Sequence, residues 1–220
     1  TKNHVQGYFV YDSKKSGALT VSHLRFGENP IRSTYLIDSA NFIACHHFNY
    51  LEKYDILKDA EKGATFLLNA PFESNKVWDK LPKKIQEGII SKKLKFYVIN
   101  ASKVAREAEM GSRINTILQT CFFAISGIIP KEEAIQKIKD AIKKSYSAKG
   151  EKMLLKNYEA VDQAIANLHE IDYSKLQAGN IEIELAIPDD APDFVKNVLA
   201  RIMQFEGDEL PVSAFPVDGT

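Results

Sequence analysis

The sequence predicts an α/β fold in which helices cover a largely parallel sheet and the C-terminal half of the chain is helical. Short β-rich apolar runs alternate with helix-like segments in the first half, a spacing typical of βαβ units. In the second half, apolar residues recur at intervals of three and four, which indicates amphipathic helices. Because a parallel sheet needs cover on both faces, these helices are its expected covers.

Five extended runs are the expected strands, over residues 8–11, 18–26, 42–45, 65–68 and 94–99. The polar turn over 12–17 is short enough to favour a hairpin-like connection between the first two. Helix-like segments over 50–58 and 77–93, the second rich in lysine, separate the later strands.

The helical half begins at Ser102, which can cap a helix that runs to about Met110 and ends at Gly111. A nearly all-apolar helix over 114–126 follows and is expected to be buried. Pro130 then occupies a first-turn position of the next helix. The apolar faces of that helix and its successor are formed by residues 135, 138, 142 and 146 and by residues 154, 158, 161, 165 and 168. A short amphipathic helix over 194–205 comes last.

Charge and cysteine content exclude several function classes. The chain has 29 Lys and Arg and 29 Asp and Glu, so its net charge gives no reason to expect a nucleic-acid or membrane partner. It also lacks an apolar stretch of the roughly 20 residues that a membrane span needs. Its two cysteines, Cys45 and Cys121, are too few for an iron–sulfur cluster or a Cys-rich zinc site. We expect both to be reduced and buried, as in a cytoplasmic protein.

The polar turn after the first strand is the most suggestive candidate binding segment. Lys14 and Lys15 stand beside Ser16 and Gly17 there, so that two ammonium groups and small backbone donors share one loop. Such a loop can hold a phosphate group. The alternative is a solvated hairpin turn with no ligand.

A second candidate lies at the start of the apolar helix, where Arg113 and Asn115 follow Gly111 and Ser112. A helix N-terminus has free N–H groups and the positive end of the helix dipole, and it can therefore bind an anion. The alternative is that Ser112 caps the helix and Arg113 pairs with a surface carboxylate.

The remaining polar clusters give weaker signals. Asn69, at the end of an apolar run, is a turn former or a ligand contact, and the turn is the favoured interpretation. Cys45, His46 and His47 resemble a metal cluster, but neighbouring strand residues point to opposite faces and cannot readily chelate one ion. Lipase-type, phosphate-loop and metalloprotease motifs are all missing. We therefore predict no catalytic residue and no metal ligand in this chain.

Several segments together resemble the central, gamma-type domain of pyruvate:ferredoxin/flavodoxin oxidoreductases. They are residues 8–27, 30–36, 78–82, 93–99 and 111–127. Residues 210–220 resemble the start of the segment that follows this domain. The resemblance is collinear over nearly all of the chain. It implies a Rossmann-like domain over residues 1–206 and the beginning of a linker over 207–220.

The resemblance also implies a function. The family oxidatively decarboxylates pyruvate with coenzyme A, giving acetyl-CoA, CO2 and reduced ferredoxin or flavodoxin. Thiamine diphosphate, magnesium and [4Fe-4S] clusters are expected in other domains of the same polypeptide, and the parent is expected to be a homodimer. The gamma-type domain helps to bind coenzyme A, and its Gly-rich phosphate segment is expected upstream of Tyr8, outside this sequence.

Matched to the family by motif, Lys14, Lys15, Ser16 and Gly17 correspond to a loop at the coenzyme A phosphates, and Arg113 and Asn115 correspond to a second loop at that site. Two lysines and an arginine can offset much of the charge on a pyrophosphate and a 3′-phosphate. Two hypotheses follow. The chain is a coenzyme A-binding module, or it is an assembly domain of the same enzyme with no direct ligand role.

Overall fold

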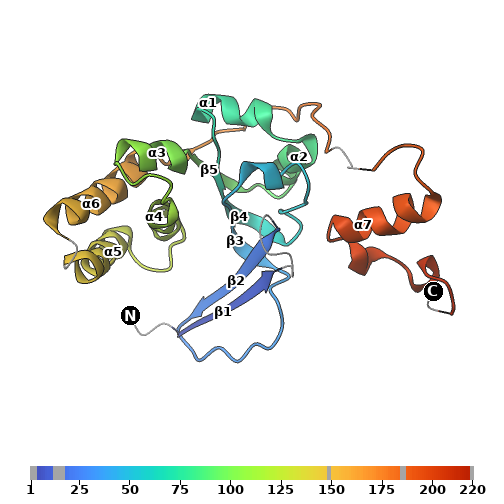
Figure 1. The fold of residues 1–220 in the computed structure, drawn as a ribbon, viewed down its shortest axis with the longest axis horizontal. Coiled ribbons are helices and arrows are strands. Elements are labelled where there is room, and N and C mark those ends of the chain that lie inside the picture. Colours follow the sequence, from blue (N-terminus) through green and yellow to red (C-terminus); the bar gives the residue numbers. More distant parts are fainter. Residues whose placement is uncertain (1–3, 12–17, 148–149, 184–186, 219–220) are drawn as a thin grey trace.

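A computed structural model describes residues 4–11, 18–147, 150–183 and 187–218 (Figure 1). Its strands form two separate sheets: an antiparallel pair and a four-stranded sheet. The pair consists of β1 (His4–Tyr11) and β2 (Thr20–Gly27), which confirms the predicted hairpin. The second sheet consists of β3 (Ala40–Cys45), β4 (Ala60–Asn69), β5 (Lys95–Ile99) and β6 (His169–Glu170).

The four-stranded sheet has the order β3-β4-β5-β6 and is largely parallel, as predicted. β3, β4 and β5 run parallel to one another, with register pairs such as Phe66 opposite Phe96. The two-residue strand β6 closes one edge by pairing antiparallel with β5. A strand of two residues is too short to leave a periodic signal in the sequence, so it was not predicted.

Side chains alternate between two buried layers along the parallel strands. In β4, Phe66 and Leu68 point into one layer and Leu67 into the other, as the twofold period of a strand requires. In β5, Phe96 and Ile99 divide in the same way. Phe66 and Phe96 stack across the sheet with ring centroids 5.3 Å apart. Both faces of the sheet are therefore part of the core.

Helices cover both of these faces (Figure 1). The first layer is formed by the 3-10 turn η1 (Phe48–Tyr50), α1 (Ser74–Val77), η2 (Trp78–Lys80) and α2 (Lys83–Ser91). The second layer is formed by α3 (Ala101–Glu107), α4 (Asn115–Ile125) and α6 (Glu151–Ala166). Outside them, α5 (Lys131–Tyr146) packs on α4 and α6 through Ile138, Ile142 and Val161.

Three local predictions are wrong. The helix-like segment expected over 77–93 is divided, because Leu81 is extended before Pro82 and α2 begins only at Lys83. The expected helix over 50–58 is a series of turns, because the Asp55 carboxylate accepts a hydrogen bond from the Leu57 N–H at 3.2 Å and so competes with helical pairing. The helix expected to be capped by Ser102 begins earlier. Its cap is Asn100, whose side chain accepts a hydrogen bond from the Lys103 N–H at 2.9 Å.

After β6, the chain returns as an extended strap, residues 171–183, across the helices of the first layer. The Tyr173 ring stacks on Trp78 at 5.6 Å, and its hydroxyl donates a hydrogen bond to the Leu94 carbonyl at 2.6 Å. Further along, the Lys83 N–H donates to the Ile181 carbonyl at 2.7 Å. These contacts join the strap to the sheet domain.

The C-terminal segment contains η4, a π-helix over Val195–Leu199, then α7 (Ala200–Met203) and two 3-10 turns, η5 (Gly207–Glu209) and η6 (Val212–Ala214). It packs on the sheet domain through the rings of Phe205 and Tyr54, 5.3 Å apart, and through Lys84, which pairs with both Asp55 and Glu206. Within the described ranges, no helix is long and apolar enough to cross a membrane.

Candidate functional site

The carboxyl ends of β3, β4 and β5 are joined by one side chain, that of Asn69. Its amide nitrogen donates to the His46 carbonyl at 3.0 Å, and its amide oxygen accepts from the Ala101 N–H at 3.0 Å. Asn69 thus links the chain after β3 to the start of α3 after β5. Its amide is engaged by the backbone of neighbouring segments, so this residue organises the sheet edge where ligands of open α/β sheets bind.

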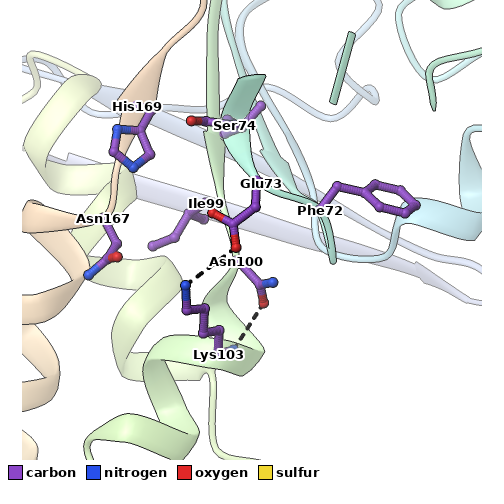
Figure 2. A pocket seen from close by; sticks show the side chains of 9 residues that line it. Phe72, Glu73, Ser74, Ile99, Asn100, Lys103, Asn167 and His169 are labelled. Carbon is purple, nitrogen blue, oxygen red and sulfur yellow. Dashed lines mark hydrogen bonds and ion pairs between the residues drawn. The ribbon is translucent and has the colours of Figure 1, made fainter. Parts of the chain in front are cut away.

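A small cavity of about 30 Å³ adjoins this edge at the end of β5 (Figure 2). Its polar lining comes from two sides: Glu73, Ser74, Asn100 and Lys103 on one, and Asn167 and His169 on the other. Glu73 and Lys103 form an ion pair at 3.4 Å, which cancels their charges. The volume is enough for about one water molecule. The cavity can hold water or one polar group of a larger ligand, and its neutral lining does not favour an anion.

The histidines after β3 lie on the same edge. Burial, together with the charge of the neighbouring His47, lowers the pKa of His46. The His47 ring lies 5.7 Å from that of Tyr50. Within the described ranges, no three His, Cys, Asp or Glu side chains are grouped so that they could hold a metal ion.

The first predicted phosphate loop, Lys14, Lys15, Ser16 and Gly17, lies outside the described residues. The residue after it, Ala18, is described, and its carbonyl accepts a hydrogen bond from the Tyr50 hydroxyl at 3.4 Å. Since Tyr50 belongs to η1, which follows β3, Ala18 lies beside the carboxyl edge of the parallel sheet. The strand before the loop, β1, is not part of that sheet; among the described strands, β2 is its one partner.

The second predicted loop is described. Arg113 and Asn115 are exposed at the start of α4, on the helical layer, and only one residue separates them. Ile114 occupies the cap position and no side chain caps the helix, so Ser112 is not the cap that the alternative required. Among the described residues, no carboxylate lies within ion-pair distance of Arg113. The first N–H groups of α4 therefore remain available to an external acceptor.

Sequence reasoning singled out Asn69 as a turn former or ligand contact, but it missed the bridge that Asn69 makes between two segments and the places of Asn100 and Lys103 at the sheet edge. The available signal was an asparagine directly after each of two neighbouring buried strands, Asn69 after 65–68 and Asn100 after 94–99. Asparagine at such positions commonly bonds to nearby backbone. The contribution of His169 had no comparable signal, because it depends on a pairing between β5 and β6.

Both cysteines are unpaired and buried, as predicted. Burial raises the pKa of the Cys45 thiol to about 11 and that of the Cys121 thiol to about 12. Reactive cysteines need a lowered pKa and access to solvent. These two therefore serve as small core residues.

Comparison with known proteins gives two family matches. A family model described as pyruvate ferredoxin/flavodoxin oxidoreductase matches residues 1–167, and one described as a domain of unknown function matches residues 180–220.

Curated relatives match nearly the whole chain. It is 55% identical over 217 residues to the pyruvate-flavodoxin oxidoreductase of Rhodospirillum rubrum, a match that covers 99% of this chain and 18% of the relative. Identity to the pyruvate:ferredoxin oxidoreductase of Moorella thermoacetica is 48% over 219 residues, covering 100% and 19%. The chain thus spans less than a fifth of the length of these relatives.

A solved structure, the PORC subunit of pyruvate oxidoreductase from Thermotoga maritima, has a similar fold. The TM-score is 0.58 at 15% identity, and the match covers 77% of this chain and 83% of the subunit. At this identity the likeness concerns the fold alone.

Proposed function

Because the chain belongs to the pyruvate ferredoxin/flavodoxin oxidoreductase family, we propose that it is the part of such an enzyme that binds coenzyme A. The whole enzyme would convert pyruvate and coenzyme A to acetyl-CoA and CO2 and pass two electrons to ferredoxin or flavodoxin. Thiamine diphosphate, magnesium and [4Fe-4S] clusters would be held by other domains of the polypeptide, which would form a homodimer. This chain would present the thiol to the acyl intermediate, a gain in proximity that makes its capture nearly unimolecular.

The exposed start of α4 is the observation that carries the proposal. Arg113 has no carboxylate partner among the described residues, Arg113 and Asn115 are exposed, and no side chain caps α4, so an exposed guanidinium adjoins the uncapped start of the helix. Guanidinium and backbone N–H groups are the donors that phosphate oxygens accept from most readily. We assign one phosphate of coenzyme A to Arg113 and Asn115.

The second contact proposed is the loop of Lys14, Lys15, Ser16 and Gly17. Support comes from Ala18, because its hydrogen bond to Tyr50 places the residue after the loop beside the carboxyl edge of the sheet. Coenzyme A carries two separated phosphate sites, a pyrophosphate and a 3′-phosphate. Two cationic loops are therefore an appropriate complement to it.

The test replaces both lysines, Lys14→Ala with Lys15→Ala, in the whole enzyme. We expect the KM for coenzyme A to rise by about tenfold or more, since each hydrogen bond to a charged group contributes ~1.5–3 kcal/mol. Pyruvate decarboxylation without coenzyme A should be spared. The matched control is Lys143→Ala with Lys144→Ala, a neighbouring pair exposed on α5. Unchanged coenzyme A kinetics in the first variant would refute the proposal.

One observation favours the alternative, an assembly role: the hairpin that carries the lysine loop has an uncovered apolar face, with Phe9 64% and Tyr11 74% exposed. If the lysines serve assembly, the double substitution will lower the stability or oligomeric yield of the enzyme with no selective effect on coenzyme A. The KM measurement therefore separates the two functions.

We also propose that the domain ends near residue 206, with 207–220 opening a linker. In support, Phe205 and Glu206 still contact the sheet domain, through Tyr54 and Lys84. Limited proteolysis of the whole enzyme should cleave within 207–220 before it cleaves within the strap.

A further inference from the structure

The two faces of the β1–β2 hairpin differ in what covers them. In the antiparallel register, Gln6 lies opposite Arg25 and Tyr8 opposite His23, so these four side chains share a face. The loop after β2 covers that face. Gln6 donates to the Ser33 carbonyl at 2.7 Å, Arg25 donates to the carbonyls of residues 35 and 36, and His23 accepts from the N–H of residue 37.

The opposite face of the hairpin is apolar and uncovered. Its exposed side chains are Val5 (61%), Phe9 (64%), Tyr11 (74%) and Leu24 (44%). Gly7 lies between them opposite Leu24, and a side chain at this position would come within 3.2 Å of the Leu24 methyl carbon. Glycine therefore lets Leu24 lie flat over the strand pair. The result is a continuous apolar surface, which we call the hairpin face.

The hairpin face continues into a groove of about 280 Å³ between the hairpin and the helices α4 and α5. The side chains that line it include Val5, Phe26, Phe123, Ile128, Ile138 and Lys137. Phe26 anchors this end of the hairpin, because its ring lies 5.8 Å from that of Phe122 in α4. The hairpin lies low in the view of Figure 1. The end of β1 and the start of β2 lie nearest the four-stranded sheet, and the opposite end of the hairpin points away from it.

Four apolar side chains of the hairpin face are exposed in this domain. Two-stranded hairpins are at best marginally stable unless a hydrophobic face packs on something else. Contiguous exposed apolar surface on a folded domain also marks an interaction site. The loop after β2 packs on the polar face, where Val10 (41%) and Val21 (39%) are the exposed large apolar side chains that the structure describes, so most of the uncovered apolar surface lies on the opposite face.

We propose that the hairpin face and its groove form the interface with another domain of the same polypeptide. That domain packs on the hairpin face through an apolar surface and inserts an apolar side chain into the groove. The reason for choosing this occupant is length: the chain spans 18% of the Rhodospirillum rubrum relative and aligns with it over 217 residues. Most of such a polypeptide is therefore available to cover this face. The proposal rests on family membership and does not depend on coenzyme A binding.

Hydroxyl-radical footprinting of the full-length polypeptide, without coenzyme A, tests the proposal. Oxidation of Phe9 and Tyr11 is measured by mass spectrometry in the native enzyme and in the same enzyme in denaturant. Phe66 and Phe96, both fully buried here, serve as internal references for protection. We expect Phe9 and Tyr11 to be protected nearly as strongly as these references, at every protein concentration. Oxidation of Phe9 and Tyr11 at the rate seen in denaturant would overturn the proposal.

The same footprint distinguishes a second copy of the chain as occupant. If protection of Phe9 and Tyr11 disappears on dilution, the face is a contact between copies and the proposal is wrong.

A Phe9→Asp variant provides a second measurement. Phe9 is 64% exposed in this domain, so the variant should fold, but the melting temperature of the full-length enzyme should fall because a carboxylate enters an apolar interface. A control, Lys131→Asp on the exposed start of α5, should leave it unchanged.

Discussion

The hydroxyl of Tyr50 lies 3.4 Å from the carbonyl oxygen of Ala18 and donates a hydrogen bond to it. Tyr50 is the last residue of η1, directly beyond β3, and Ala18 directly follows the proposed phosphate loop. This bond connects the loop end of the hairpin to the parallel sheet. It gives a way to disturb the position of the loop without removing either lysine.

We expect Tyr50→Phe to raise the KM for coenzyme A in the whole enzyme by about fivefold, because a hydrogen bond contributes ~1 kcal/mol. The phenylalanine ring keeps the contacts with His47 and Tyr54, so kcat should change little. Steady-state kinetics with varied coenzyme A measures both quantities. The control is Tyr54→Phe, since the Tyr54 hydroxyl makes no hydrogen bond to any residue that the structure describes. An equal effect in both variants would contradict the assigned role of Tyr50.

Gln86 secures the strap to the helices of the first layer. It is 1% exposed, donates to the Trp78 carbonyl at 2.7 Å and accepts from the Gly179 N–H at 2.6 Å. Gln86→Leu leaves the Gly179 N–H without its partner, whereas the Trp78 carbonyl keeps its hydrogen bond from the Leu81 N–H at 3.1 Å. One lost partner costs ~1–3 kcal/mol, so we expect the free energy of unfolding to fall by ~1–3 kcal/mol in urea titrations.

The matched control for this variant is Gln136→Leu, on the exposed face of α5, where Asp140 is the one described residue to which the side chain bonds. That change should stay within ~0.5 kcal/mol of the parent, as surface substitutions usually do. If the free energy of unfolding falls equally in the two variants, the hydrogen bonds of Gln86 do not stabilise the packing of the strap on the helices.

The helices α5 and α6 could be predicted because their information is local. Apolar residues such as Ile138 and Ile142 recur at the helical period, and Pro130 marks a start. The prediction of a helix over 50–58 was wrong for a reason that is also local but leaves a weaker sequence signal. The side chain of one aspartate, Asp55, accepts a hydrogen bond from the backbone N–H two residues later. Propensity alone does not decide between these outcomes.

The contacts that fix the sheet edge and the strap could not be predicted, because they join distant residues. Gln86 and Gly179 are 93 positions apart, and Asn69 and Ala101 are 32 apart. The spacing of residues within one segment holds no information about which distant residue that segment will contact. That Arg113 and Asn115 share one turn is local and could be predicted, their role in binding stays a prediction, and the assembly of the sheet edge across elements could not be predicted.

The buried thiols of Cys45 and Cys121 should make stability fall in alkaline solution. Burial raises the pKa of Cys45 from its ordinary 9.0 to about 11, and that of Cys121 to about 12, so the folded state holds protons that the unfolded state releases. Their contribution is fully present below pH 9 and is lost as pH rises from 9 towards 11 and 12. Urea unfolding measured at intervals from pH 8 to pH 11 should show this decline, and the Cys45→Ala and Cys121→Ala variants should each show a shallower one, whatever their stability at pH 8. Lysine and tyrosine titrations are common to all three proteins and cancel in the comparison. Identical slopes would mean that these thiols ionise as freely in the folded chain as in the unfolded one.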